Sequence, residues 1–236
     1  MENVNRKYTL EDFLEIIKIL RAENGCPWDR EQTHESLRSC MMEEAAEFVS
    51  SIRIYQQTGS MENMREELGD ILLQVVMHSQ IASEEGLFTW SDVVQEVSEK
   101  MVRRHPHVFG QADVKDSNEV LKNWDEIKKQ EKEGKTWIES PLREIPYELP
   151  ALTRAPKVQK KIEKLYAPQK SFHESISEIQ MQVEKIKKAG MDEKLDETIG
   201  NILWELSNIC CIKKIPQEQI LNDKIEDMID FYEKDL

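Results

Sequence analysis

Residues 67–81 restrict the fold more than any other segment, because apolar side chains cover almost every face of the helix that they predict. At about 100° per residue, the exception is a stripe of Glu67, Asp70, Gln74 and His78, spaced three or four residues apart. A helix that is apolar all round is a buried one. Carboxylates on such a helix need a partner, since burying an unpaired charge costs several kcal/mol. The fold must therefore enclose this helix and supply a counter-charge.

The rest of the chain also predicts helices, and no alternating strand pattern of useful length occurs. With eight glycines and eight prolines in 236 residues, breaks are few. Capping signals and breaks predict helices from Thr9 to Gly25, 34–57, 61–85, Thr89 to His105, 119–132, 157–166, 171–189, 192–213 and 216–234. The proline-rich segment 141–156 is predicted to be extended. Short connections imply antiparallel neighbours, so the expected fold is an all-α bundle.

Composition excludes several classes of protein. A net charge of −14 argues against a general nucleic-acid binder and against adsorption to anionic membranes. No apolar run has the length of a membrane helix, and the first residues lack the apolar core of a signal peptide. The four cysteines form no CxxC pair, which argues against a zinc site and fits a reduced, cytoplasmic protein.

Three glutamates, Glu43, Glu44 and Glu47, share one face of the helix that precedes this buried one. Alone, that face is an ordinary solvated one. Because the turn at 58–60 is short, the two helices should pair antiparallel and bring these residues opposite Glu67 and Asp70. Five carboxylates call for a divalent cation, and oxygen ligands favour Mg²⁺ or Mn²⁺. A di-iron centre would need two Glu-x-x-His pairs, and the chain has one, at 31–34.

A basic cluster follows, in which Lys100, Arg103 and Arg104 share a helical face. Cations at a helix C-terminus are also favoured by the helix dipole, so this pattern alone leaves two interpretations equal. Beside a site of five carboxylates, phosphate binding is the better interpretation. Mg²⁺ typically binds through few carboxylates plus substrate phosphates, which suggests phosphate-ester or anhydride chemistry.

The second half repeats the first after a shift of 131 residues. Glu43 and Glu47 align with Glu174 and Glu178, but three of the acids are lost. These replacements are Ser175 for Glu44, Thr198 for Glu67 and Asn201 for Asp70. With a four-residue deletion, the basic positions become Asp227, Asp230 and Phe231. A duplicated copy that kept its packing and lost its chemistry accounts for this pattern; the alternative is a chance similarity between two amphipathic helical segments.

Four ordered motifs make the chain resemble the MazG family of nucleoside triphosphate pyrophosphohydrolases. These motifs are EExxE at 43–47 with ExxD at 67–70, CPWD at 26–29 with QTH at 32–34, RRHPHVF at 103–109, and Asn123-Trp124 with Lys128 and Glu131. The resemblance covers residues 8–135 strongly and 157–236 weakly. It implies an all-α MazG-like bundle that forms a homodimer or higher oligomer. It also implies Mg²⁺-dependent hydrolysis of NTPs or dNTPs to the monophosphate and pyrophosphate.

By the same resemblance, each site residue receives a role. The metal-binding and catalytic acids are Glu43, Glu44, Glu47, Glu67 and Asp70, and the substrate-binding residues are Lys100, Arg103, Arg104, Trp124, Lys128 and Trp28. The expected domains are a catalytic one at 1–135, a proline-rich linker at 136–156 and a degenerate MazG-like domain at 157–236. The alternative is a non-catalytic nucleotide-sensing or regulatory module.

Overall fold

A computed structural model describes residues 6–112, 114–132, 140–188 and 195–234, and all regular structure among them is helical. The predicted all-α fold is therefore confirmed. The first helices are α1 (Leu10–Arg21), α2 (Pro27–Glu31), α3 (Arg38–Thr58), α4 (Glu62–Glu84), α5 (Trp90–Arg104), α6 (Pro106–Phe109) and α7 (Ser117–Lys132). The others are α8 (Ala151–Leu165), α9 (Phe172–Lys188), α10 (Asp196–Lys213) and α11 (Gln217–Glu233). The predicted helix start at 192 and the linker residues 136–139 lie outside the described residues.

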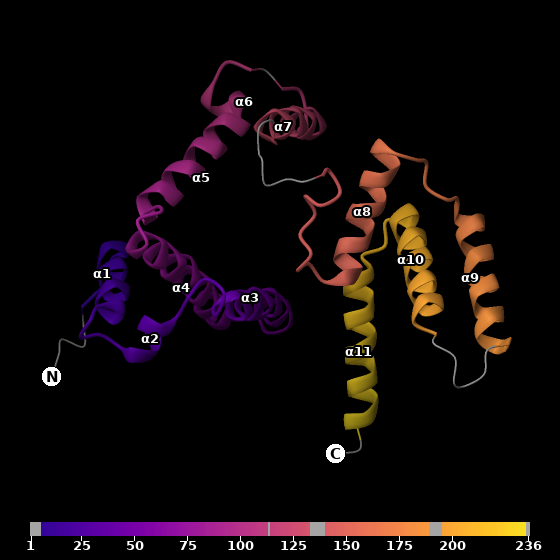
Figure 1. The fold of residues 1–236 in the computed structure, drawn as a ribbon, viewed down its shortest axis with the longest axis horizontal. Helices are drawn as coiled ribbons and strands as arrows, with labels where there is room; N and C mark the ends of the chain where they lie inside the picture. The colour runs from indigo at the N-terminus through magenta and orange to yellow at the C-terminus, as the bar shows by residue number, and fades with distance from the viewer. Residues whose placement is uncertain (1–5, 113, 133–139, 189–194, 235–236) are drawn as a thin grey trace. The chain divides into compact units, whose positions relative to one another are not determined.

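The helices divide into two compact units, Met1–Lys132 and Glu133–Leu236 (Figure 1). In the first unit, α3 packs along α4, α1 packs on α4, and α5 contacts α6 and α7. In the second unit, α9 packs along α10, and α8 contacts both α10 and α11. The catalytic and degenerate roles expected for the two halves stay predictions, as does their origin by duplication.

A short left-handed turn makes α3 and α4 neighbours. Gly59 ends α3 with φ 74°, a conformation that glycine adopts without strain, and its N–H donates to the carbonyl of Tyr55 at 2.8 Å. Helix α4 begins three residues later. This turn places the acidic face of α3 beside the N-terminal half of α4.

The core of the first unit forms around the C-terminal half of α4. Buried side chains from α1, from the segment before α3 and from α4 make one cluster: Ile17, Leu37, Val76, Met77 and Ile81. The N-terminal half of α4 is less enclosed, and Leu68 is 50% exposed. The expectation of a helix buried all round is therefore wrong for a single chain, because the described helices cover only part of this end of α4.

One helix boundary differs from the prediction, and one short helix was not predicted. Helix α1 ends at Arg21 rather than near Gly25, and a short helix, α2, lies between the first two predicted helices. Arg21 holds this segment in place, because its guanidinium bonds the carbonyls of Asp29 and Gln32 and forms an ion pair with Glu84 at 2.8 Å. The side chain that closes α1 thus holds the α2 segment against α4.

The proline-rich segment is not extended to its end, since α8 begins at Ala151 and runs through Pro156. A proline inside a helix cannot donate to the carbonyl four residues earlier. Here that carbonyl, of Leu152, accepts a bond of 2.6 Å from Nε2 of Gln217, a buried residue at the start of α11. A distant side chain thus supplies the hydrogen bond that Pro156 lacks.

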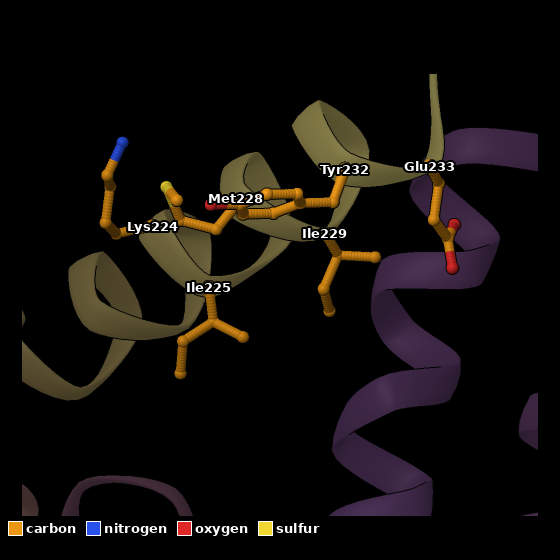
Figure 2. Close-up of a pocket in the computed structure, with 6 residues that line it drawn as sticks. All are labelled: Lys224, Ile225, Met228, Ile229, Tyr232 and Glu233. Atoms are coloured by element: carbon orange, nitrogen blue, oxygen red, sulfur yellow. The ribbon is translucent and has the colours of Figure 1, made fainter. Parts of the chain in front are cut away.

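Helix α11 exposes several large apolar side chains. Figure 2 shows Ile225, Met228, Ile229 and Tyr232 lining a shallow depression on this helix.

All four cysteines are free and half-buried. None of the described helices combines the length and hydropathy that a bilayer crossing requires.

Candidate metal and phosphate site

Three of the predicted acids meet between α3 and α4. Carboxylate oxygens of Glu44, Glu67 and Asp70 all lie within 4.8 Å of one another, and no other such group of three potential ligands occurs among the described residues. Glu67 and Asp70 share a face of α4 because they are three residues apart. Glu67 is only 8% exposed, and Nδ2 of Asn63, one turn earlier, donates to its Oε1 at 2.7 Å.

The carboxylates of this acidic group repel one another when no cation is bound between them. Partial desolvation, followed by the charges of Asp70, Glu47 and Glu67, raises the pKa of Glu44 above its ordinary value. Glu47 therefore borders the group, one turn along α3 from Glu44. Glu43 is exposed and lies outside the group of three. Water stabilises Glu43, whereas the other acids repel one another at short range.

The residues present fit a hard divalent cation. All three ligands are oxygens, which suit Mg²⁺ or Mn²⁺ rather than a metal that prefers sulfur or imidazole. A further oxygen lies one turn beyond Asp70 on the same face of α4. This atom, Oε1 of Gln74, is buried and has no hydrogen-bond partner among the described residues. Such an orphaned acceptor is typical of a place where water or an ion completes the structure.

The predicted basic residues lie on the last turns of α5, and α7 contacts them. Oε1 of Glu131 accepts from Nε of Arg103 at 2.9 Å, and Oε2 accepts from Nη2 of Arg104 at 2.5 Å. The hydrogen bonds from Arg104, and then those from Arg103, lower the pKa of Glu131 to about 2. Lys100 lies one turn earlier on α5 and is half-buried.

Two of the predicted nucleotide-binding residues adjoin this basic cluster, and the third does not. The indole of Trp124 contacts His105 edge-on at 5.1 Å, with the guanidinium of Arg104 and the ammonium of Lys128 near its ring. Its Nε1 is buried without a hydrogen-bond partner among the described residues. Trp28 lies on α2, where it is 61% exposed.

Comparison with known proteins identifies the family. The family model of the MazG nucleotide pyrophosphohydrolase domain matches residues 32–109. The chain is 35% identical over 224 residues to the nucleoside triphosphate pyrophosphohydrolase/pyrophosphatase MazG of Thermotoga maritima, covering 95% of this chain and 84% of that protein. The chain belongs to the MazG family.

Two further relatives were found. The nucleoside triphosphate pyrophosphohydrolase of Escherichia coli K12 is 35% identical over 206 residues, which cover 85% of this chain and 76% of that enzyme. The uncharacterized protein YabN of Bacillus subtilis is 51% identical over 148 residues. That match spans 63% of this chain and only 29% of YabN.

In the second unit of this MazG-family chain, the ammonium of Lys170 lies near the positions that align with Glu44 and Glu47 of the first unit. Ser175, at the position of Glu44, donates to Oε2 of Glu205 at 2.6 Å, and Nζ of Lys170 donates to Oε1 at 2.6 Å. Lys170 also lies 3.7 Å from Glu178, at the position of Glu47. In this half Lys170 thus supplies positive charge to Glu205 and Glu178.

Sequence reasoning missed three of these contacts. Asn63 stands four residues before Glu67, and that helical spacing alone would have indicated the bond. The contact of Glu131 with both arginines follows from the docking of α7 on α5, for which the sequence carries no local signal. Lys170 precedes α9 and pairs with a residue 35 positions later, so no periodicity reveals it.

Proposed function

We propose that this MazG-family chain hydrolyses nucleoside triphosphates to the monophosphate and pyrophosphate, with Mg²⁺ or Mn²⁺, in its first unit. One observation carries the proposal: the carboxylates of Glu44, Glu67 and Asp70 converge within 4.8 Å between two helices. The names of the Thermotoga and Escherichia relatives supply the reaction class. The acidic group supports our assignment of the reaction to the first unit.

In this proposal Glu67 and Asp70 hold the metal, with Glu44, Glu47 and Glu43 at its edge. The metal, when bound, supplies positive charge that polarises the anhydride and acidifies a bound water. Asn63 keeps the Glu67 carboxylate in one orientation by its 2.7 Å hydrogen bond. Preorganisation of this kind matters because a ligand that must reorient loses affinity.

The reaction is an in-line displacement at the α-phosphorus. A water oxygen forms the new bond to phosphorus, the bond to the pyrophosphate oxygen breaks, and a carboxylate takes the proton of the water. Glu44 is our candidate for that acceptor, as a carboxylate at the edge of the acidic group that stays free of the metal.

The basic cluster binds the phosphates. Lys100, Arg103 and Arg104 offset the charge of the triphosphate and of the departing pyrophosphate. Trp124 offers an indole face on which a base stacks, and its buried Nε1 offers a donor that the described protein atoms do not use. Lys128, beside that ring, adds positive charge. Trp28, exposed on α2, is the third residue that we assign to the nucleotide.

Product analysis tests the reaction. The purified chain, incubated with a panel of NTPs and dNTPs and Mg²⁺, is expected to release pyrophosphate and the monophosphate in equal amounts, measured by anion-exchange chromatography. Chelation of the metal should abolish the release. Orthophosphate as the product would contradict the proposal, and nucleotide binding without turnover would establish the sensing function instead.

We place no catalysis in the second unit, because Lys170 neutralises Glu205 and lies near Glu178 there. A metal would have to compete with a covalently tethered ammonium for the same oxygens. The second unit then has a structural or regulatory role.

The free cysteines are compatible with a reducing compartment, and we assign the chain to the cytoplasm on that ground.

We also propose that the chain acts as a homodimer or higher homo-oligomer. Val49, Leu68 and Leu72 expose apolar surface on the two helices that carry the acidic group, and α11 exposes more (Figure 2). Exposed apolar patches of this extent favour association. Light scattering during gel filtration is expected to give at least twice the mass of the chain, and a monomer at micromolar concentration would contradict this.

A further inference from the structure

Glu131 contacts both arginines of the basic cluster from the same side. Its Oε1 lies 2.7 Å from Nη2 of Arg103, and its Oε2 accepts from Nε and Nη2 of Arg104 at 3.1 and 2.5 Å. The glutamate side chain is 13% exposed, whereas that of Arg103 is 52% exposed. One enclosed carboxylate therefore orients two guanidinium groups, one of which faces solvent.

We infer that Glu131 is a positioning residue for phosphate binding: it holds Arg103 and Arg104 so that their remaining N–H groups present a fixed double fork to the triphosphate. The inference rests on the proposed function and deepens it. Each guanidinium uses its Nε and Nη2 edge for Glu131, so the Nη1 side is the part that a phosphate meets. Fixed geometry matters, because bidentate recognition depends on the planar fork.

The same contact docks the helix that carries Trp124. Glu131 lies two turns after Trp124 on α7, and the indole rests edge-on against His105, the residue that follows α5. Helix α7 is thus attached to the end of α5 at two points. Glu131 sets the orientation of the arginines and the position of the indole together.

Glu131 is a fixed group rather than a switch. The arginine hydrogen bonds hold its pKa at about 2, so the carboxylate is ionised at every pH at which the enzyme would work. Two neighbouring guanidiniums repel each other, and the carboxylate between them removes most of that repulsion. A glutamine at this position would offer a single oxygen, and its amide N–H groups would face a guanidinium.

A second interpretation makes Glu131 an internal plug that phosphate must displace. The two interpretations predict opposite changes in apparent affinity. Loss of a plug tightens binding of the triphosphate, whereas loss of a positioning group weakens it. A third interpretation, a clip that only stabilises α7, predicts a lower melting temperature with KM and kcat unchanged.

The test compares Glu131→Gln with Glu126→Gln, which makes the same charge change at an exposed position of α7. We expect Glu131→Gln to raise KM for the triphosphate by about tenfold and to lower kcat by less than about threefold, as loss of uniform binding does. The KM of Glu126→Gln should match the wild type. A lower KM, or unchanged kinetics with a lower melting temperature, would overturn the inference.

Calorimetric titration with inorganic tripolyphosphate separates this inference from the proposed reaction. Binding of this probe requires the arginines and no hydrolysis, so it is measurable even for a chain that turns over no nucleotide. Glu131→Gln should bind tripolyphosphate about tenfold more weakly than the wild type does. Equal or tighter binding contradicts the role of Glu131, while absent turnover by a wild type that binds normally contradicts only the proposed function.

Discussion

Asp70→Asn is expected to abolish turnover while making the metal-free protein more stable. Asp70 is one of three carboxylates whose oxygens lie within 4.8 Å, so the metal-free fold bears their mutual repulsion. An asparagine of the same shape removes one charge and adds an N–H donor for Glu44 or Glu67. Relief of a like-charge contact at this range should raise the free energy of unfolding by about 1 kcal/mol. The measurement is chemical denaturation in the presence of a chelator.

Activity should move in the opposite direction. Loss of a direct ligand weakens metal binding more than loss of a neighbouring residue does. We therefore expect kcat/KM for NTPs to fall at least about a hundredfold. Stabilisation by Mg²⁺ gives an independent readout. At a concentration tenfold above its dissociation constant, Mg²⁺ should stabilise the wild type by about 1.4 kcal/mol and Asp70→Asn hardly at all.

Glu66→Gln is the matched control for Asp70→Asn. It removes one negative charge from an exposed position of α4, beside Glu67 and outside the acidic group. Its turnover and its response to Mg²⁺ should equal those of the wild type. Retained turnover in Asp70→Asn would show that the acids are no metal site. A metal-free Asp70→Asn protein that unfolds more readily than the wild type would contradict the expected repulsion among the three acids.

The sequence predicts most of this site because its information is local. Helical spacing alone places Glu67 and Asp70 on one face, and the short turn at Gly59 brings Glu44 opposite them. It fails where contacts join distant residues. Pro156 lies inside a helix because Gln217, far along the chain, bonds the carbonyl of Leu152. No local pattern contains that bond.

Exposure is the second property that periodicity does not settle. The apolar circumference of α4 predicts burial, and the residues near its C-terminal end are buried. Leu68 is half exposed in the single chain, because burial depends on which partners exist rather than on the helix itself. The proposed homo-oligomer predicts that this end of the helix is covered by a partner.

Lys170→Met is expected to destabilise the second unit strongly. The substitution keeps an unbranched side chain of similar length and removes the charge, so Glu205, 5% exposed, loses its cation. Breaking a buried ion pair from one side typically costs about 3–5 kcal/mol. Since Lys170 is itself 48% exposed, water takes part of its place, and we expect a loss of about 2 kcal/mol. Chemical denaturation of the full chain measures it.

The double variant Lys170→Met with Glu205→Gln shows whether the lost pairing is the cause. A neutral glutamine at 205 still accepts the hydrogen bond from Ser175 and leaves no uncompensated charge, so most of the lost stability should return. Equal instability of the single and double variants would show that Lys170 stabilises the unit by packing alone.

The single variant Lys170→Met also tests which of the two units carries out the reaction. Hydrogen bonding to Glu205 raises the pKa of Lys170 above its ordinary value. The ammonium therefore stays protonated, and paired with Glu205, at neutral pH. At a temperature where Lys170→Met remains folded, kcat/KM for NTPs should equal that of the wild type, since the acids of the first unit are untouched. A fall comparable to that expected for Asp70→Asn would instead place the reaction in the second unit. The Lys170 ammonium, bound to Glu205, would then take part in the reaction.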